Sequence, residues 1–429
     1  MESTLILQNP HWKNIPYQGL LDREVIGEMI QLFKLKEILI IQGIRRSGKS
    51  SVMYLMINKL LKDFPGDEIL YINLEDPSFR EAWEDPLHLR RLVEMASKIT
   101  GKIPQILLLD EIQLVKGWES YIKSVYDSLV FRKIIVTGSN QALLNSNYAT
   151  SISGRYVSLQ IFPFSLNERI NHLGFGNRFD ILSNKHHISR LLEEMMQFGG
   201  FPEICHTENA GLKRRQLIGY FDSILMRDCL SIHAVRDVHL FKSLTTYYLS
   251  TIGRPYTYSS LARTVGSNEH TVRDYLSFLT DAWLIKEIYP WSPAIKSLVS
   301  GPKKGYCSDN GLININSLSI SPDFGWLFEN LVFTELVQSG LTDIRFYSGY
   351  RECDFIVKAG QTLTAIQVCY NLNKNNQERE TSGLIEAMEK TGADKGIIVS
   401  PFSSMEISDK VSVIPIFDIY KEMQTVDIG

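Results

Sequence analysis

The sequence predicts an α/β protein of several domains, and three observations support this prediction. Short apolar runs, such as 38–41 and 106–109, have the composition of strands that are buried on both faces of a parallel sheet. Segments with apolar residues at helical spacing, such as 324–340, lie between such runs. The 429 residues also exceed one ordinary domain, so we expect two to four domains at about 150 residues each.

The composition is that of a soluble globular protein, with 44% hydrophobic and 22% charged residues. The net charge of −3 gives no overall basic field, so any nucleic-acid surface must be local. The cysteines are scattered, without a Cys-x-x-Cys pair, which favours free thiols in a reducing cytoplasm over disulfides or zinc. No secretory signal and no apolar run of about 18 residues is found, so we expect a cytoplasmic protein with no membrane partner.

The stretch from Gly43 to Ser50 has the sequence GIRRSGKS, between an apolar strand and an expected helix at 50–62. This is the spacing of a phosphate-binding loop, whose backbone N–H groups surround a triphosphate above a helix N-terminus. Lys49 would reach the β- and γ-phosphates, and the Ser50 hydroxyl would bind Mg²⁺. The predicted nucleotide-binding residues are Gly43, Arg45, Arg46, Ser47, Gly48, Lys49, Ser50 and Ser51, joined by Ser139 from a later strand.

Two carboxylates follow the apolar run at 106–109. Asp110 would hold Mg²⁺ directly or through water. Glu111 suits a general base that orients the attacking water, a group that a protein merely retaining its nucleotide does not need. A third acidic residue, Glu75, follows the strand at 68–74 and either faces the metal or lies in a solvated turn. Asp110 and Glu111 therefore favour hydrolysis of the bound nucleotide.

Polar residues after the strand at 132–136 are candidates for contacting the γ-phosphate. Ser139 and Asn140 are the main candidates, and Thr137 is a further one. Arg155 would stabilise the transferred phosphoryl group of its own chain or of a neighbouring subunit, a contact worth about 10³–10⁵ in rate. Arg45 and Arg46 are alternatives to Arg155, or else contact nucleic acid, a subunit or an acidic neighbour. The predicted catalytic residues are thus Lys49, Glu111 and Arg155.

The order of these motifs resembles a known family, the prokaryotic AAA-type P-loop ATPases of the additional-strand catalytic-glutamate class with a C-terminal restriction-nuclease-like domain of unknown function. The resemblance implies binding of ATP and Mg²⁺, hydrolysis of ATP, and a helical lid after the nucleotide core. It also suggests a homo-oligomer. The matching blocks are GIRRSGKS (43–50), YINLED (71–76), LLLDEIQ (107–113), VTGSN (136–140), SGRY (153–156), FPFSLNE (162–168), FGGFPEI (198–204) and YFDSILMRD (220–228).

Residues 255–290 have the spacing of a helix-turn-helix with a wing strand. Helices are expected at 258–265 and 269–283, and the wing strand at 284–289. The second helix would place His270, Thr271 and Arg273 near DNA, but its acidic residues oppose phosphate binding. Both a DNA-binding and a protein-packing winged helix therefore stay open. The acidic residues are Glu269, Asp274 and Asp281, and the lysines that could offset them are Lys286, Lys296, Lys303 and Lys304.

The C-terminal region resembles a restriction-nuclease-like domain that has lost part of its site. Such a site combines carboxylates that hold Mg²⁺ with a lysine that activates water. Asp354 fits, and Glu329 or Glu335 could join it, but the third element is Gln367-Val368-Cys369. An amide removes a charge from a hard-cation site and a thiol cannot replace the lysine. Lys358 and Lys374 are the nearby lysines that could replace it, but we expect a binding or docking module without nuclease activity.

The predicted organisation follows from these segments. An N-terminal segment (1–36) precedes a P-loop ATPase core (37–165), a helical lid or linker (166–250), a winged-helix-like domain (251–300) and a degenerate nuclease-like α/β domain (301–429). The predicted function is an ATPase that couples binding and hydrolysis of Mg·ATP to domain rearrangement. The alternatives are a DNA-binding ATPase, with DNA bound through 255–290, and a signalling protein that nucleotide locks without appreciable turnover. An unknown protein partner is expected in either case.

Overall fold

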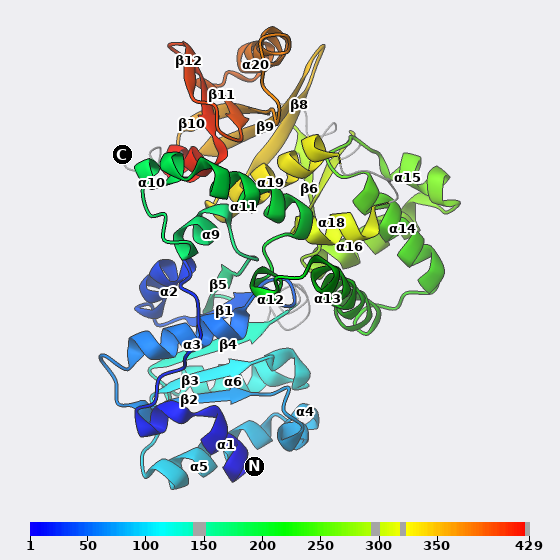
Figure 1. Cartoon of the computed structure of the whole chain (residues 1–429). Coiled ribbons are helices and arrows are strands. Elements are labelled where there is room, and N and C mark those ends of the chain that lie inside the picture. The colour runs from blue at the N-terminus through cyan, green and yellow to red at the C-terminus, as the bar shows by residue number, and fades with distance from the viewer. Residues whose placement is uncertain (140–151, 293–300, 318–322, 425–429) are drawn as a thin grey trace. The chain divides into compact units, whose positions relative to one another are not determined.

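The structure, a computed structural model, describes residues 1–139, 152–292, 301–317 and 323–424 (Figure 1). The chain forms two compact units, one of residues 1–162 with 281–283, the other of residues 163–280 with 284–429. Asn140 and Lys296, two residues singled out in the sequence, lie outside the described ranges. Within those ranges, no helix combines the length and the apolar character needed to span a membrane.

The first unit contains a five-stranded sheet in the order β2-β3-β4-β1-β5. All neighbouring strands are parallel, which confirms the predicted parallel α/β core. The strand β4 lies between the strand that precedes the phosphate-binding loop, β1, and the strand that ends in Asp110, β3. The carboxyl ends of these three strands therefore meet at one edge. The strands are β1 (Ile38–Gln42), β2 (Ile69–Asn73), β3 (Ile106–Asp110), β4 (Lys133–Gly138) and β5 (Tyr156–Gln160).

Alternate residues of each strand enter separate hydrophobic cores on the two faces of this sheet. Ile38 and Ile40 pack in one core with helices α1 (Glu2–Gln8), α5 (Leu87–Thr100) and α6 (Trp118–Asp127). Leu39 and Ile41 pack in the other with α2 (Val25–Phe33) and α3 (Lys49–Leu60). Figure 1 shows α3 alongside the sheet. The short helix α4 (Arg80–Glu84) follows β2.

The N-terminal residues cover the outer edge of the sheet rather than form a separate entry segment. The Asn9 side chain donates to the Tyr71 carbonyl and accepts from the Tyr71 N–H, both at 2.8 Å. His11 Nε2 lies 3.0 Å from the Ile69 carbonyl oxygen, and burial lowers the pKa of His11 to about 4. These side chains satisfy backbone groups that an edge strand otherwise leaves open to another chain. Residues 1–36 thus belong to the same unit as the strands.

The second unit joins a group of helices to a mixed eight-stranded sheet, in the order β12-β13-β11-β10-β9-β8-β6-β7. Its helices are α9 (Leu166–His172), α10 (Arg178–Ser183), α11 (Lys185–Phe198), α12 (Pro202–His206), α13 (Ala210–Ser223), the π-helix η5 (Ile224–Leu230), α14 (Val238–Ser250), α15 (Tyr258–Val265), α16 (Glu269–Asp281), α18 (Asn310–Asn316), α19 (Phe324–Gln338), α20 (Gln377–Thr391) and α21 (Ile419–Gln424). Its strands are β6 (Ile285–Pro290), β7 (Lys304–Cys307), β8 (Ile344–Ser348), β9 (Glu352–Ala359), β10 (Thr362–Val368), β11 (Lys395–Ser400), β12 (Met405–Ser408) and β13 (Val411–Pro415).

The two predicted helices of the helix-turn-helix form as α15 and α16, and the wing strand forms as β6. The expected boundary at residue 300 is wrong, however, because β6 pairs with β7 on one side and with β8 on the other. One sheet therefore includes both the wing strands and the strands of the C-terminal domain. The sequence did not reveal this because the pairing joins segments that are distant along the chain.

A buried corner of the second unit is held by Asp309. This carboxylate accepts from the Gly200 N–H at 2.7 Å and from the Gly311 N–H at 2.8 Å. A side chain at Gly199, whose φ is +74°, would collide with Asp309, since its Cβ would lie 1.8 Å from the carboxylate. Burial raises the pKa of Asp309 to about 7, although the backbone N–H groups favour its charged form.

The raised pKa of Asp309 predicts a pH-dependent stability. The folded chain holds this proton more tightly than the unfolded chain, so the stabilisation is complete below about pH 4 and is lost as the pH rises through about 7. Between pH 5 and pH 8 the loss amounts to about 2–3 kcal/mol. Urea unfolding of the wild type and of Asp309→Asn at several pH values measures it. If the free-energy difference between the two proteins is independent of pH, this assignment is wrong.

Candidate functional site

The loop between β1 and α3 adopts backbone conformations that glycine permits and other residues rarely adopt. Gly43 has a φ of +145° and Gly48 a φ of +94°, values that L side chains rarely adopt. A Cβ at Gly43 would lie 2.0 Å from the carbonyl oxygen of Ile161. Arg46, inside the loop, is held at a φ of +71°, a strained conformation for a residue with a side chain. Such alternating conformations turn successive N–H groups into an anion-binding concavity.

Lys49, the first residue of α3, is buried under this loop. Its ammonium donates to the carbonyl oxygens of Gly43 at 3.0 Å and Ile44 at 3.1 Å. Arg23, which precedes α2, donates to the carbonyl oxygens of Ser47 at 3.1 Å and Phe162 at 2.8 Å. The sequence did not single out Arg23, because it lies 24 residues before its partner in the loop. The loop is thus stabilised by Lys49, which belongs to the same motif, and by Arg23 from the N-terminal segment.

The loop also contains a buried hydroxyl that fits a phosphate ligand. Ser47 Oγ is buried and has no hydrogen-bond partner among the residues described. An unsatisfied buried hydroxyl costs free energy, and a phosphate oxygen is a strong acceptor for it. Together with the inward backbone amides and the cation of Lys49, this donor makes the loop fit a nucleotide phosphate.

The predicted metal-binding residues come together at the edge of the sheet. The Ser50 hydroxyl at the start of α3 lies near the buried Asp110 carboxylate at the end of β3 and lowers its pKa. Tyr71 donates to the same carboxylate at 2.8 Å, and Thr137 at the end of β4 donates to its other oxygen. Burial and the charge of Glu111 raise the pKa of Asp110, and these hydrogen bonds oppose the rise. A hydroxyl and a carboxylate near one another are oxygen ligands of the kind that Mg²⁺ uses beside substrate phosphates.

Glu111 is held in a fixed and strained orientation. Its φ of +58° is rare for a residue with a side chain, and its N–H donates to Thr137 Oγ1 at 2.9 Å. The Gln113 amide donates to the Glu111 carboxylate and lies 3.5 Å from Ser139 Oγ. Gln113 was not among the residues predicted from the sequence, and Thr137 was predicted only to contact the γ-phosphate. Thr137 lies directly at the end of β4, the strand beside β3, and this position was the available signal for its hydrogen bond to Asp110.

The expectation that Arg155 contacts the γ-phosphate of its own chain is wrong. Arg155 precedes β5, whose first residue pairs with Ile38 at the start of β1, whereas the phosphate-binding loop follows the end of β1. The two lie at opposite edges of the sheet, separated by about 15 Å of strand. The Arg155 guanidinium donates instead to Asp127 at 2.8 Å. Its use by a neighbouring subunit stays a prediction. Glu75 is exposed in the turn after β2, as in the solvated alternative.

Comparison with known proteins agrees with this geometry. Residues 35–170 match a family model described as "AAA domain". Residues 189–323 and 324–419 match "Domain of unknown function (DUF8612)" and "Domain of unknown function (DUF4143)". The uncharacterized protein MJ1544 of Methanocaldococcus jannaschii is 31% identical over 402 residues, which cover 90% of this chain and 88% of that protein. The chain belongs to the MJ1544 family.

A second relative, an uncharacterized protein of Haemophilus influenzae, is 28% identical over 410 residues, covering 94% of this chain and 98% of that protein. Among solved structures, the signal-transduction ATPase PH0952 of Pyrococcus horikoshii covers 76% of this chain and 47% of its own, at 14% identity and a TM-score of 0.30. The Aeropyrum pernix ORC1 protein in complex with DNA covers 73% and 96%, at 14% identity and a TM-score of 0.32. The MJ1544 family assignment rests on the sequence match to MJ1544 itself.

In this member of the MJ1544 family, the C-terminal carboxylates surround a lysine that the sequence analysis did not place there. The Lys304 ammonium, fully buried on β7, lies 3.5 Å from Glu329 and 3.6 Å from Asp354, and forms an ion pair with Glu352. Tyr306 donates to Glu329 at 2.7 Å. An internal cation therefore occupies the centre of the expected carboxylate group.

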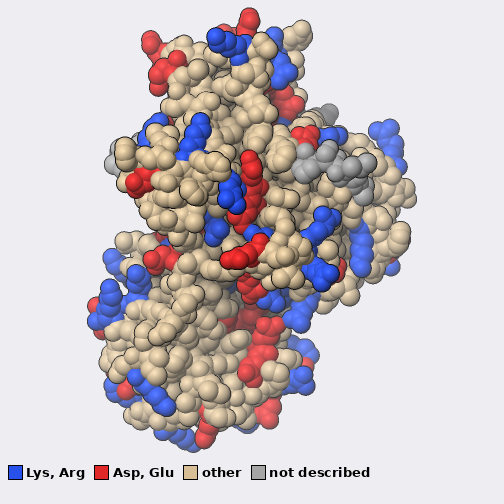
Figure 2. Space-filling model, viewed as in Figure 1, with Lys and Arg blue, Asp and Glu red and all other residues tan. Residues whose placement is uncertain are grey.

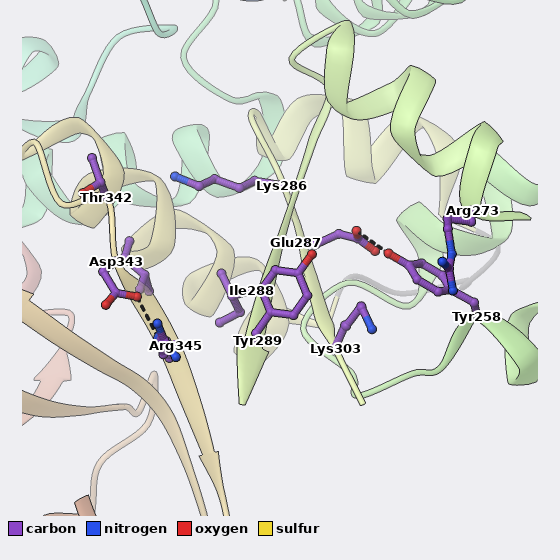
Figure 3. Close-up of a pocket in the computed structure, with 11 residues that line it drawn as sticks. Tyr258, Arg273, Lys286, Glu287, Ile288, Tyr289, Lys303, Thr342, Asp343 and Arg345 are labelled. Carbon is purple, nitrogen blue, oxygen red and sulfur yellow. Dashed lines mark hydrogen bonds and ion pairs between the residues drawn. The ribbon is translucent and has the colours of Figure 1, made fainter. Parts of the chain in front are cut away.

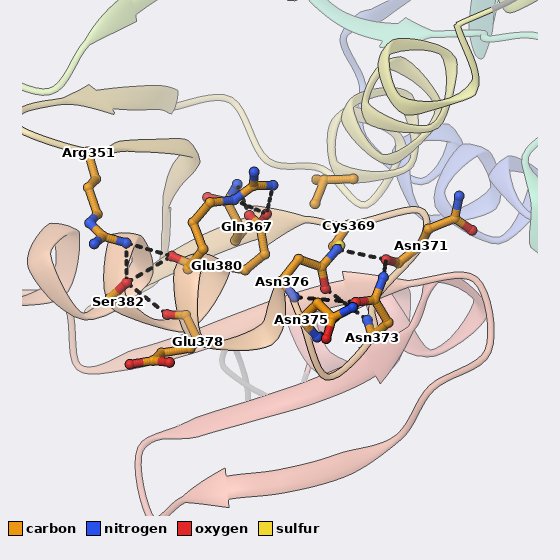
Figure 4. A network of polar contacts seen from close by, with 12 residues as sticks. Arg351, Gln367, Cys369, Asn371, Asn373, Asn375, Asn376, Glu378, Glu380 and Ser382 are labelled. Atoms are coloured by element: carbon orange, nitrogen blue, oxygen red, sulfur yellow. Dashed lines mark hydrogen bonds and ion pairs between the residues drawn. The ribbon is translucent and has the colours of Figure 1, made fainter.

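The other residues proposed for a nuclease site are engaged elsewhere. Glu335 does not join Asp354 around Lys304. Its carboxylate accepts a hydrogen bond of 2.8 Å from the Leu166 N–H at the start of α9. Gln367 donates to Glu380 on α20 at 3.1 Å, and Cys369 begins an asparagine-rich loop tied by its own side chains (Figure 4). Lys358 is exposed on β9. The lysine beside these carboxylates is therefore Lys304, not Lys358 or Lys374 as suggested from the sequence. A nuclease-like domain stays a prediction.

Proposed function

We propose that the chain is a Mg²⁺-dependent ATPase that uses binding and hydrolysis of ATP to rearrange its domains. The observation that supports this most directly is the proximity of the Ser50 hydroxyl to the buried Asp110 carboxylate, with Glu111 next in sequence. It unites the last residue of the phosphate-binding loop with the acidic end of β3. A protein that only bound an anion would need the loop but neither carboxylate.

The residues have distinct roles in this proposal. The amides of the loop, with Lys49, bind the β- and γ-phosphates, and Arg45, Arg46, Ser47 and Ser51 line the same segment. Ser50 and Asp110 hold Mg²⁺, which offsets the negative charge of the phosphates. Glu111 accepts a proton from the water that attacks the γ-phosphorus, so that ADP and phosphate are the products. Ser139, beside Gln113, helps to orient Glu111 or contacts the γ-phosphate.

The DNA-binding alternative finds little support in α16. Arg273 on this helix is paired with Glu269 at 3.1 Å, and His270 with Asp274 at 3.0 Å. Side chains that pair with one another within a helix are poorly suited to replace counterions on DNA phosphates. On the face seen in Figure 2, lysines and arginines are interspersed with acidic residues. We therefore keep the ATPase as the proposed function, without base recognition by α16.

Calorimetric titration with ATP and MgCl₂ tests the proposal. Wild type is expected to bind Mg·ATP, and Lys49→Ala to bind it about 10- to 100-fold more weakly, because hydrogen bonds to charged phosphates are lost. Lys59→Ala, on the exposed side of α3, is the matched control and should bind normally. Absence of binding in the wild type would refute the proposal. Tight retention of nucleotide without release of phosphate would instead support the nucleotide-locked alternative.

A further inference from the structure

A pocket of about 560 Å³ opens within the second unit where β6 diverges from β8. The two strands pair only at Tyr289 and Pro290 among the residues described, so the preceding part of β6 is separated from residues 342–344. Figure 3 shows the lining on both sides of β6, with Thr342, Asp343 and Arg345 on one side and Tyr258 and Arg273 on the other. Its volume lies in the range of about 300–1,000 Å³ that small-molecule sites occupy.

The lining combines cations with aromatic rings. Lys303 lies 4.6 Å from the ring of Tyr258 and 5.5 Å from that of Tyr289, and Arg273 lies 5.0 Å from Tyr258. Tyr289 is 39% exposed, so much of its ring is open to a ligand. Arg345 lies on β8 directly opposite Tyr289. Exposed aromatic rings among cations are the features that bind the bases and the phosphates of nucleotides.

The two carboxylates of the pocket are already engaged. Glu287 accepts from Tyr258 at 2.9 Å and also from Tyr256, and Asp343 accepts from Arg345 at 2.8 Å. Neither carboxylate is within ion-pair distance of Lys286. In the part of the chain that the structure describes, the ammonium of Lys286 has no recorded hydrogen bond or ion pair. Figure 3 shows it extending from β6 toward Thr342.

The isolation of Lys286 is informative because the residue is half-buried. Burial lowers the pKa of Lys286, and no opposing interaction raises it. A cation that is partly removed from water without a partner destabilises the fold, and an anion bound beside it would remove that cost. An acidic peptide would need only the cations, whereas the open ring of Tyr289 favours a ligand that also carries a flat aromatic group.

We propose that this pocket binds a phosphorylated nucleoside, with its base on Tyr289 and its phosphate between Lys286 and Arg345. The ligand is either a free nucleotide or one unit of a single-stranded nucleic acid. This site is separate in sequence from the phosphate-binding loop at 43–50, and the proposal does not depend on hydrolysis of ATP. If the ligand is a nucleic acid, the proposal assigns its recognition to the fork between β6 and β8 rather than to α16.

Fluorescence anisotropy with a labelled five-nucleotide oligothymidine tests the pocket, in full-length Lys49→Ala so that the phosphate-binding loop does not contribute. Binding should weaken as salt rises. Tyr289→Ala is expected to reduce affinity about 5- to 100-fold, and Lys286→Met about 10-fold. Competition by thymidine monophosphate assigns the source of the ligand. If the monophosphate displaces the labelled strand, or binds when the strand does not, the pocket accepts a free nucleotide. If the strand binds and the monophosphate cannot displace it, the ligand is a single-stranded nucleic acid.

Lys358→Met, on the exposed side of β9, is the matched control and should bind like its parent. Without ligand, Lys286→Met should melt at the same temperature as its parent or higher, because it removes a half-buried cation. Failure of both the oligonucleotide and the monophosphate to bind would overturn the proposal. Equal losses in Lys286→Met and Lys358→Met, or a lower melting temperature for Lys286→Met, would also overturn it. Failure of the Mg·ATP titration alone would leave it intact.

Discussion

Glu111→Gln is expected to lower the single-turnover rate of ATP hydrolysis about 10²- to 10⁴-fold while Mg·ATP still binds. The substitution keeps the size of the side chain and the hydrogen bond from the Glu111 N–H to Thr137, but it removes the base that accepts the proton of the attacking water. The left-handed backbone at residue 111 is equally strained with glutamate or glutamine, so the fold should not distinguish them. Rapid mixing with radiolabelled ATP, followed by separation of phosphate, measures the rate.

Glu75→Gln is the matched control for this experiment. Glu75 also follows a strand of the same sheet, but it is exposed in a turn, so its removal should change the rate less than twofold. Binding of Mg·ATP by calorimetry should be unchanged in both variants. Unaltered turnover in Glu111→Gln would exclude Glu111 as the base, and equal losses in the two variants would point to a general electrostatic effect.

Lys304→Met should destabilise the second unit by about 3–5 kcal/mol, the largest effect on stability that we expect. The Lys304 ammonium is 0% exposed and forms ion pairs with Glu329, Asp354 and Glu352. Without it, negative charges would lie together in a buried site. Burial and the charge of Asp354 already raise the pKa of Glu329 to about 8, although Lys304 opposes the rise. Urea unfolding of the full-length chain, followed by far-ultraviolet circular dichroism, measures the loss.

Lys395→Met provides the comparison, because Lys395 pairs with Glu422 at 2.8 Å in a more exposed position and should contribute at most about 1 kcal/mol. The double variant Lys304→Met with Asp354→Asn should recover part of the stability, since one of the unpaired charges is gone. A Lys304→Met protein as stable as Lys395→Met would mean that water or ions compensate the carboxylates. The internal cation would then not be what holds this region together.

Local sequence patterns alone predict the phosphate-binding loop and the parallel strands around it. The phosphate-binding loop and the strand that ends in Asp110 are contiguous segments, and their glycines and apolar runs permit few other conformations. For the same reason the two helices of the helix-turn-helix and the wing strand were predicted close to their observed bounds. Local patterning fixes an element because its hydrophobic period must match the period of the backbone.

Tertiary structure alone decided which distant residues meet. It brought Arg23 to the phosphate-binding loop, moved Arg155 to the far edge of the sheet, and placed Lys304 among carboxylates from other elements. The order of strands sets these contacts, and strand order depends on packing between segments that share no local signal. A single lysine in a strand gives the same sequence pattern whether its side chain faces solvent or carboxylates. Only the assembled sheet distinguishes these two environments.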